Sequence, residues 1–389
     1  MKLSRFISKL DVPLLVTTII LFIFGLLNIV NASSQAVVLR YGTNIYYYFY
    51  RQLAVLIIGF VLALILFFIP TKKYYRWILL LYLGEIGLLT YLYLFGESYL
   101  GSVNWIDFHG IRFQPSELAK PIMIIAVALL FERFCSKLRN NRRYTRYDHY
   151  KLIGIIILIG SIFPAFVFLE KDLGTTLILV SIFGIMFLAS PIQRVEKFQS
   201  IILIIIALII GGFIYSLKSG GNLFTDEQKS RLDFYNPCAN YEEGGYQTCN
   251  GFIAINSGGL LGVGIGNSKQ VSYLPESHTD SVFAIIAEEY GLLFCTAIFI
   301  FYLIILYRIF NLASQVSDIR NKYICLGVGI YIVMHIIINL GGLFGSMPLT
   351  GVPLPFFSYG GSYTISLICS LAIVQRICYE NKTKKIKIR

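Results

Sequence analysis

The feature that most constrains this chain is a succession of long apolar stretches separated by short polar segments. Each runs for about 17 to 25 residues, the length with which an α-helix crosses roughly 30 Å of hydrocarbon. Only 14% of the residues are charged, whereas soluble domains carry about 25%. We predict an all-α polytopic membrane protein that forms a single membrane domain over residues 1–389. About ten spans are expected, near residues 13–31, 52–70, 75–95, 117–133, 152–169, 173–191, 199–217, 281–307, 323–345 and 363–377.

The basic residues indicate the orientation of these spans. Most of the 33 Lys and Arg fall in alternate polar segments, such as 133–151 and 376–389, and cytoplasmic loops are enriched in these residues. Both termini are therefore predicted to be cytoplasmic, with a large outer loop at 218–280, between spans seven and eight, and a Pro/Gly-rich outer segment at 346–362. Basic tracts beside the anionic inner leaflet account for the net charge of +12 without a nucleic-acid partner.

The large outer loop contains three patterns of its own. Residues 246–257 predict a short amphipathic helix able to lie in the membrane interface. The glycine-rich run 258–266 favours a tight turn against the membrane surface, and the alternative is a nest of backbone amides for an anion. Cys238 and Cys249 could form a disulfide in an oxidising compartment or remain two free thiols.

Three motifs stand out in the outer segments and at their borders: 113–120 (FQPSELAK), 275–280 (PESHTD) and 348–362 (PLTGVPLPFFSYGGS). These motifs resemble the SEDS family (shape, elongation, division and sporulation). Asp172, Arg231 and Asn339 also stand at family positions. The resemblance covers essentially the whole chain, and Trp105 with the following residues is more similar to RodA, the elongation member, than to FtsW, the division member. Departures from the family pattern are Glu170-Lys171 and His335.

The resemblance implies a peptidoglycan glycosyltransferase of the bacterial cytoplasmic membrane. Members join lipid II units: a sugar 4-hydroxyl attacks the anomeric carbon of a second lipid-linked sugar and displaces undecaprenyl pyrophosphate. A carboxylate that takes the hydroxyl proton typically contributes about 10²–10⁴-fold to the rate. The resemblance assigns this role to Asp280, at the outer end of span eight, while the residues alone allow equally that Asp280 caps the helix.

Further candidates follow from charge and position. Glu117 and Lys120 stand three residues apart on one helix face and are expected to form a structural ion pair, unless Lys120 binds the pyrophosphate. Arg231 and Lys269 suit the same anion. Glu288 and Glu289 are the alternative bases.

Other polar and aromatic residues receive less specific roles. Trp105 could stack on a sugar or belong to the interfacial belt, and Ser358 and Tyr359 are expected to contribute polar contacts near Asp280. Glu85 and His335 are interpreted as contacts between helices.

Two other functions fit the same sequence features. One is a flippase that transports lipid II, and the other is a non-catalytic scaffold for a class B penicillin-binding protein. The resemblance implies that protein as a partner in either case, together with other membrane proteins of the elongation complex. No cofactor is required, although a divalent cation could assist with the pyrophosphate; we expect no resident metal site, because the sequence contains no ligand cluster.

Overall fold

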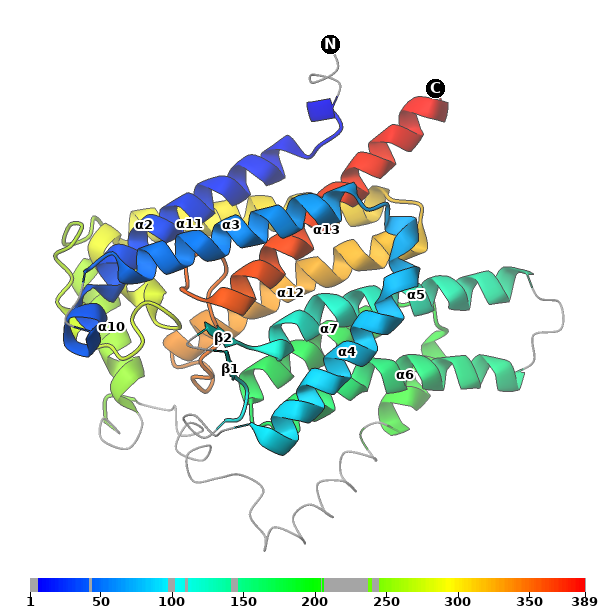
Figure 1. Cartoon of the computed structure of the whole chain (residues 1–389), viewed down its shortest axis with the longest axis horizontal. Helices are drawn as coiled ribbons and strands as arrows, with labels where there is room; N and C mark the ends of the chain where they lie inside the picture. Colours follow the sequence, from blue (N-terminus) through cyan, green and yellow to red (C-terminus); the bar gives the residue numbers. More distant parts are fainter. Residues whose placement is uncertain are drawn as a thin grey trace, which may run out of the picture.

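The computed structural model describes residues 6–41, 44–96, 102–108, 111–140, 146–203, 205, 237–239 and 245–388. Ten α-helices with described bounds lie within these ranges (Figure 1), and residues 194–203 are also helical. The ten helices are α2 (Val12–Tyr41), α3 (Tyr47–Phe68), α4 (Tyr74–Phe95), α5 (Pro115–Asn140), α6 (Arg146–Leu169), α7 (Leu173–Ala189), α10 (Tyr246–Gly258), α11 (Val282–Gln315), α12 (Ile319–Leu343) and α13 (Gly361–Ile388).

Seven of these helices are long and apolar enough to cross a membrane: α2, α3, α4, α6, α11, α12 and α13. The apolar helix α7 is shorter, with 17 residues, and α5 carries more charge. Nine of the ten predicted spans thus coincide with helices, because apolar side chains and internally paired backbone groups are what a bilayer requires. Most of the remaining prediction, 199–217, lies outside the described residues.

Helices α12 and α13 form the centre of the bundle. Two thirds of the most apolar window of each is buried, against 22% for α3 and α4. Helix α13 packs on α3 and α5, and α11 packs on α12, α10 and α2. Large apolar side chains on α3 and α4, such as Phe60 and Leu79, are exposed, as expected for surfaces that face lipid.

The prediction of an all-α fold needs one correction. Two short antiparallel strands, β1 (Ile106–Phe108) and β2 (Ile111–Phe113), pair before α5. Asp107 lies opposite Arg112 in this pair, and their charged groups are 3.8 Å apart. The alternation of apolar and charged residues over six positions is the usual strand pattern, but it is too short to stand out in so apolar a sequence.

Helix α11 is interrupted near its N-terminal end. Gly291 has φ 77° and ψ 178°, a backbone conformation that favours glycine. The glycine-rich run packs against this break so closely that a Cβ on Gly262 would lie 2.2 Å from the Glu289 carbonyl oxygen. The run is therefore a tight backbone turn, as predicted, but it packs against α11, whereas the prediction placed it against the membrane surface.

Candidate functional site

Asp280 lies in the turn that leads into α11, beside α10 and α12. Its Oδ1 accepts hydrogen bonds from Thr279 Oγ1 at 3.2 Å and from Gln247 Nε2 at 3.4 Å. Its backbone carbonyl accepts a hydrogen bond of 2.8 Å from Asn339 Nδ2. The residue directly before α11 is Ser281, which makes no side-chain cap. Asp280 therefore does not cap the helix.

The second carboxylate oxygen of Asp280 faces a glycine. A Cβ on Gly351 would lie 3.6 Å from Asp280 Oδ2, and Gly351 has φ +69°. Oδ2 is thus not covered by a side chain from that position. Burial, reinforced by the nearby Glu276 carboxylate, raises the pKa of Asp280 to about 6. A carboxylate with such a pKa is ionised near neutral pH and still basic enough to take a proton.

The Pro/Gly-rich segment 346–362 lies against the Asp280 turn. Asn339 Nδ2 donates to the Val352 carbonyl as well as to that of Asp280. The Ser358 hydroxyl donates to the Thr279 carbonyl, and the Tyr359 amide donates to the His278 carbonyl at 2.8 Å. As predicted, the segment is irregular up to the start of α13, and its backbone is paired within the protein.

Ser358 is buried, and its hydroxyl also accepts a 2.7 Å hydrogen bond from the Leu354 amide. It therefore fastens the segment onto the Asp280 turn. The half-buried Tyr359 ring packs against Tyr48, with centroids 4.8 Å apart.

Glu117 and Lys120 form a buried ion pair behind this segment. Lys120 Nζ lies 2.7 Å from Glu117 Oε1 and 3.0 Å from His335 Nε2. His335 Nδ1 in turn lies 3.1 Å from the Pro353 carbonyl oxygen; with the ring proton on Nδ1, His335 donates to that carbonyl and accepts from Lys120 through Nε2. The side chain of Lys120 has no exposed surface. The pair thus connects α5 through α12 to the Pro/Gly-rich segment.

Glu288 and Glu289 fasten the loop that precedes Asp280. Glu288 accepts hydrogen bonds from the hydroxyls of Ser257 and Ser268 and from the amides of Lys269 and Gln270. Such a filled acceptor set suits a structural carboxylate better than a base.

Glu289 performs a similar task for the glycine-rich run, because it accepts from the Gly266 amide and from Asn31 of α2. The amides of Val263 and Gly264 donate to the carbonyls of Glu288 and Glu289. These three amides thus have acceptors within the chain, which does not favour the anion nest.

Of the other predicted residues, those in the described part of the chain have no recorded hydrogen bond to the Asp280 side chain. The Lys269 side chain is exposed, and Trp105 is half-buried just before β1. Glu85 is buried on α4, and its Oε1 has no hydrogen-bond partner among the described residues. Arg231 lies outside the described residues.

Gln247 and the disulfide were not identified as parts of the site from sequence. Gln247, in the first turn of α10, contacts both Asp280 Oδ1 and Ser281 Oγ. Cys249 on the same helix is bonded to Cys238. The proximity of Gln247 to the PESHTD motif depends on how α10 folds back, which no local pattern reveals.

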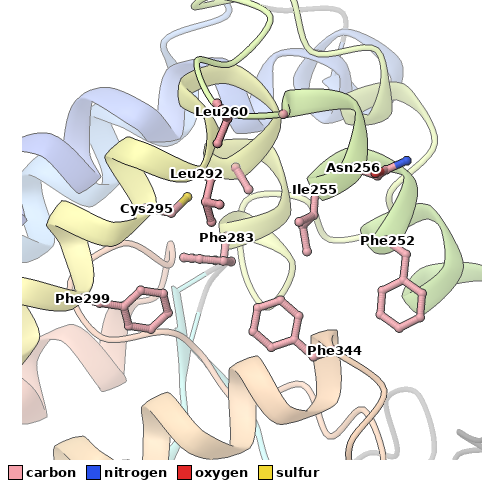
Figure 2. A pocket seen from close by; sticks show the side chains of 11 residues that line it. Phe252, Ile255, Asn256, Leu260, Phe283, Leu292, Cys295, Phe299 and Phe344 are labelled. Carbon is pink, nitrogen blue, oxygen red and sulfur yellow. The ribbon is translucent and has the colours of Figure 1, made fainter.

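An apolar cavity of about 540 Å³ opens between α10, α11 and the end of α12. Figure 2 shows its lining, which includes Phe252, Ile255, Phe283, Leu292 and Phe344. This volume lies within the range of roughly 300–1,000 Å³ typical of ligand sites. Phe283, one of the lining residues, stands in the first turn of α11 and follows Asp280 by three residues in the chain.

Among the residues that the structure describes, no group of three or more His, Cys, Asp or Glu side chains is placed to hold a metal ion. Glu288 and Glu289 instead accept hydrogen bonds from hydroxyl and amide donors.

The chain is similar to known proteins over nearly its whole length. A sequence model of the cell cycle protein family FtsW, RodA and SpoVE matches residues 12–383. A protein of Bacillus subtilis strain 168 named "probable peptidoglycan glycosyltransferase FtsW" is 30% identical over 400 residues, with 98% of this chain and 95% of the relative covered. A protein of Enterococcus hirae with the same name is 32% identical over 375 residues, with coverage of 94% and 90%.

Solved structures share the fold. A chain from a structure on the coordination of polymerization and crosslinking by a peptidoglycan synthase complex superimposes with a TM-score of 0.72 at 22% identity, covering 96% of this chain and 98% of that one. The crystal structure of the rod shape determining protein RodA from Thermus thermophilus gives a TM-score of 0.65 at 22% identity, with coverage of 96% and 97%.

Proposed function

The chain belongs to the FtsW, RodA and SpoVE family of cell cycle proteins, and on that premise we propose that it is a peptidoglycan glycosyltransferase that polymerises lipid II into β-1,4-linked glycan strands. The main structural support is the Asp280 carboxylate: its Oδ1 accepts hydrogen bonds from two donors, and its Oδ2 faces Gly351. The names of the relatives from B. subtilis and E. hirae support this activity.

In the proposed reaction Asp280 acts as the general base. The 4-hydroxyl oxygen of the acceptor sugar forms a bond to the anomeric carbon of the donor sugar, and its proton passes to Asp280 Oδ2. The bond from that carbon to the pyrophosphate oxygen breaks, and undecaprenyl pyrophosphate leaves with the electron pair. A single displacement of this kind inverts the anomeric centre, which converts an α-linked donor into a β-linked strand.

In this proposal, basic side chains bind the pyrophosphate of the substrate and an apolar cavity binds its prenyl tail. The exposed Lys269 and Arg231 would attract the pyrophosphate. The apolar cavity beside Phe283 (Figure 2) would accept the first part of a prenyl tail, because its walls are mainly aromatic and aliphatic and its rim residues Leu260 and Leu292 are exposed. A divalent cation, if required, would arrive with the pyrophosphate.

The proposed topology has ten spans in one domain, with both termini cytoplasmic and the loop 218–280 on the outer face between spans seven and eight. Cationic contacts at the helix ends remote from Asp280 support this orientation, since cytoplasmic ends are enriched in Lys and Arg. Arg308 of α11 pairs with Asp11 at 2.8 Å. Lys382 of α13 donates to the carbonyls of Ser8 and Leu10, so the two terminal segments lie together.

The expected partner is a class B penicillin-binding protein, since glycan strands must be crosslinked by a transpeptidase. The synthase-complex structure with this fold supports such an assembly. A role in elongation agrees with the RodA-like features around Trp105 and with the RodA structure. The names of the sequence relatives point instead to division, and shape defects after depletion would separate the two roles: rounded cells for elongation, filaments for division.

The testing experiment is strand synthesis from labelled lipid II in detergent by the purified protein with its penicillin-binding partner. We expect polymer from the wild type and a loss of about 10²-fold or more for Asp280→Ala and Asp280→Asn, the contribution of a general base. Gln315→Ala, at the exposed far end of α11, is the matched control. Because no membrane has to be crossed in detergent, a flippase or a scaffold would give no polymer even as wild type.

A further inference from the structure

Gln247 ties α10 to the turn that carries Asp280. Its Nε2 donates to Ser281 Oγ at 2.8 Å and lies 3.4 Å from both Asp280 Oδ1 and the Pro275 carbonyl oxygen. The only other side-chain donor recorded to Oδ1 among the described residues is Thr279. Gln247 thus helps to decide which carboxylate oxygen is held and which one remains turned toward Gly351.

An amide at this position can act only through its neighbours. It has no proton affinity near neutral pH, so it cannot replace Asp280 as a base, but its N–H groups stabilise the ionised form of a carboxylate. Removal of these donors should raise the pKa of Asp280 and free its side chain to rotate. Both effects reduce the rate of proton transfer without requiring any contact between Gln247 and the substrate.

The disulfide attaches the helix that presents Gln247 to the segment 237–239. Cys249 is buried, stands two residues after Gln247 and is bonded to Cys238. The other end of α10 is fixed by close packing, since a Cβ on Gly258 would lie 2.1 Å from the Ala287 carbonyl oxygen. The first turn of α10 therefore has a covalent attachment at the end that reaches Asp280.

We infer that Gln247 is a positioning residue for Asp280, and that the Cys238–Cys249 disulfide holds α10 where Gln247 can reach the carboxylate. This inference rests on the function proposed above, with Asp280 as the base.

The test compares pH–rate profiles of strand synthesis for Gln247→Leu, which removes the donors, and Gln247→Lys, which replaces them with a charged donor. For the leucine variant we expect the acidic limb to move up by about one pH unit, the size of one hydrogen bond to a charged group, so that the rate at about pH 5 falls about tenfold at unchanged KM while the rate near neutral pH falls less. For the lysine variant the limb should move to lower pH. Gln315→Leu, on the exposed far end of α11, is the control.

A wild-type profile for Gln247→Leu, or an equal loss at every pH in both variants, would overturn the positioning role. If the wild type polymerises and Asp280→Asn does not, such a result rejects only this inference. If the wild type makes no polymer, the proposed function itself fails.

The disulfide is tested by Cys238→Ser with Cys249→Ser, alone and combined with Gln247→Leu. If the bridge acts through Gln247, the combined variant should be no slower than Gln247→Leu alone, because effects along one path do not add. Losses that multiply would reject this part of the inference. If the serine variant does not fold, the bridge can instead be reduced with a dithiol in the folded wild type and in folded Gln247→Leu. Alkylation counts the released thiols, and the two reduced proteins are then compared in the same way.

Discussion

Replacement of Lys120 by methionine should destabilise the protein much more than replacement of both Lys120 and Glu117. Lys120 has no exposed surface, and its ammonium lies 2.7 Å from Glu117 Oε1. The other oxygen, Oε2, has no hydrogen-bond partner among the described residues. Lys120 is thus the group that compensates the charge of Glu117, and its loss leaves that charge buried.

The magnitudes follow from these contacts. Breaking a buried pair by removing one partner costs about 3–5 kcal/mol, while replacing both by apolar groups of similar size is often neutral. In either variant His335 Nε2 loses its 3.0 Å contact with Lys120, which adds about 1–3 kcal/mol for a polar group left unpaired. Lys120→Met should therefore lose stability both from the unpaired Glu117 charge and from the unpaired His335 nitrogen. The double variant Glu117→Leu with Lys120→Met should lose only the contribution of the His335 nitrogen.

Thermal unfolding in detergent compares the stability of the single and double variants with that of the wild type. Strand synthesis then compares the activity of the double variant with that of the wild type. Because Lys120 is buried and its ammonium contacts Glu117 and His335, the folded double variant should still polymerise lipid II. A folded but inactive double variant would refute the structural role and favour pyrophosphate binding by Lys120. A single variant as stable as the wild type would refute the reasoning about the buried charge.

Two further outcomes are expected. Since Asp280 must be ionised to act as a base and its pKa is raised to about 6, the initial rate of strand synthesis should level off above pH 6 and fall about tenfold for each pH unit below it; a flat profile between about pH 5 and pH 7 would contradict this. Gly258→Ala should lower the thermal unfolding temperature, because its Cβ would lie 2.1 Å from the Ala287 carbonyl oxygen and overpacking typically costs about 1–3 kcal/mol. Gly84→Ala, with no atom within 4 Å of its Cβ, should cause little change, and equal shifts would refute the packing argument.

Sequence reasoning succeeded where the bilayer imposes a simple rule. A span needs a long apolar helix, so hydropathy alone located nine of the expected helices. The prolines of the segment 346–362 predicted an irregular backbone, and α13 begins only at Gly361. The amphipathic pattern at 246–257 predicted α10, which the structure places at Tyr246–Gly258. Each of these signals is local.

The features that were missed depend on distant residues or on single positions. His335 does make the contact between helices that was predicted for it, but its partner Lys120 is 215 residues away and was not identified. The break at Gly291 rests on one glycine within an apolar helix, where most glycines simply continue the helix. Gln247 looked like one polar residue among several on α10, and its role depends on where α10 docks. Such contacts are set by tertiary packing, so a single sequence without homologues carries little information about them.

The glycine-rich run serves as a substitute turn for α11. Next to Gly291, the Leu292 and Leu293 amides donate to the carbonyls of Gly259 and Leu260, and the carbonyls of Glu288 and Glu289 accept from Val263 and Gly264. Four backbone groups that an unbroken helix would pair internally thus find their partners in the loop. Deletion or lengthening of the loop would orphan them, at about 1–3 kcal/mol for each that is buried. The glycine-rich run and α11 should therefore be exchangeable between relatives only when both are transferred together. A chimera that takes the run from one relative and α11 from another should fail to fold.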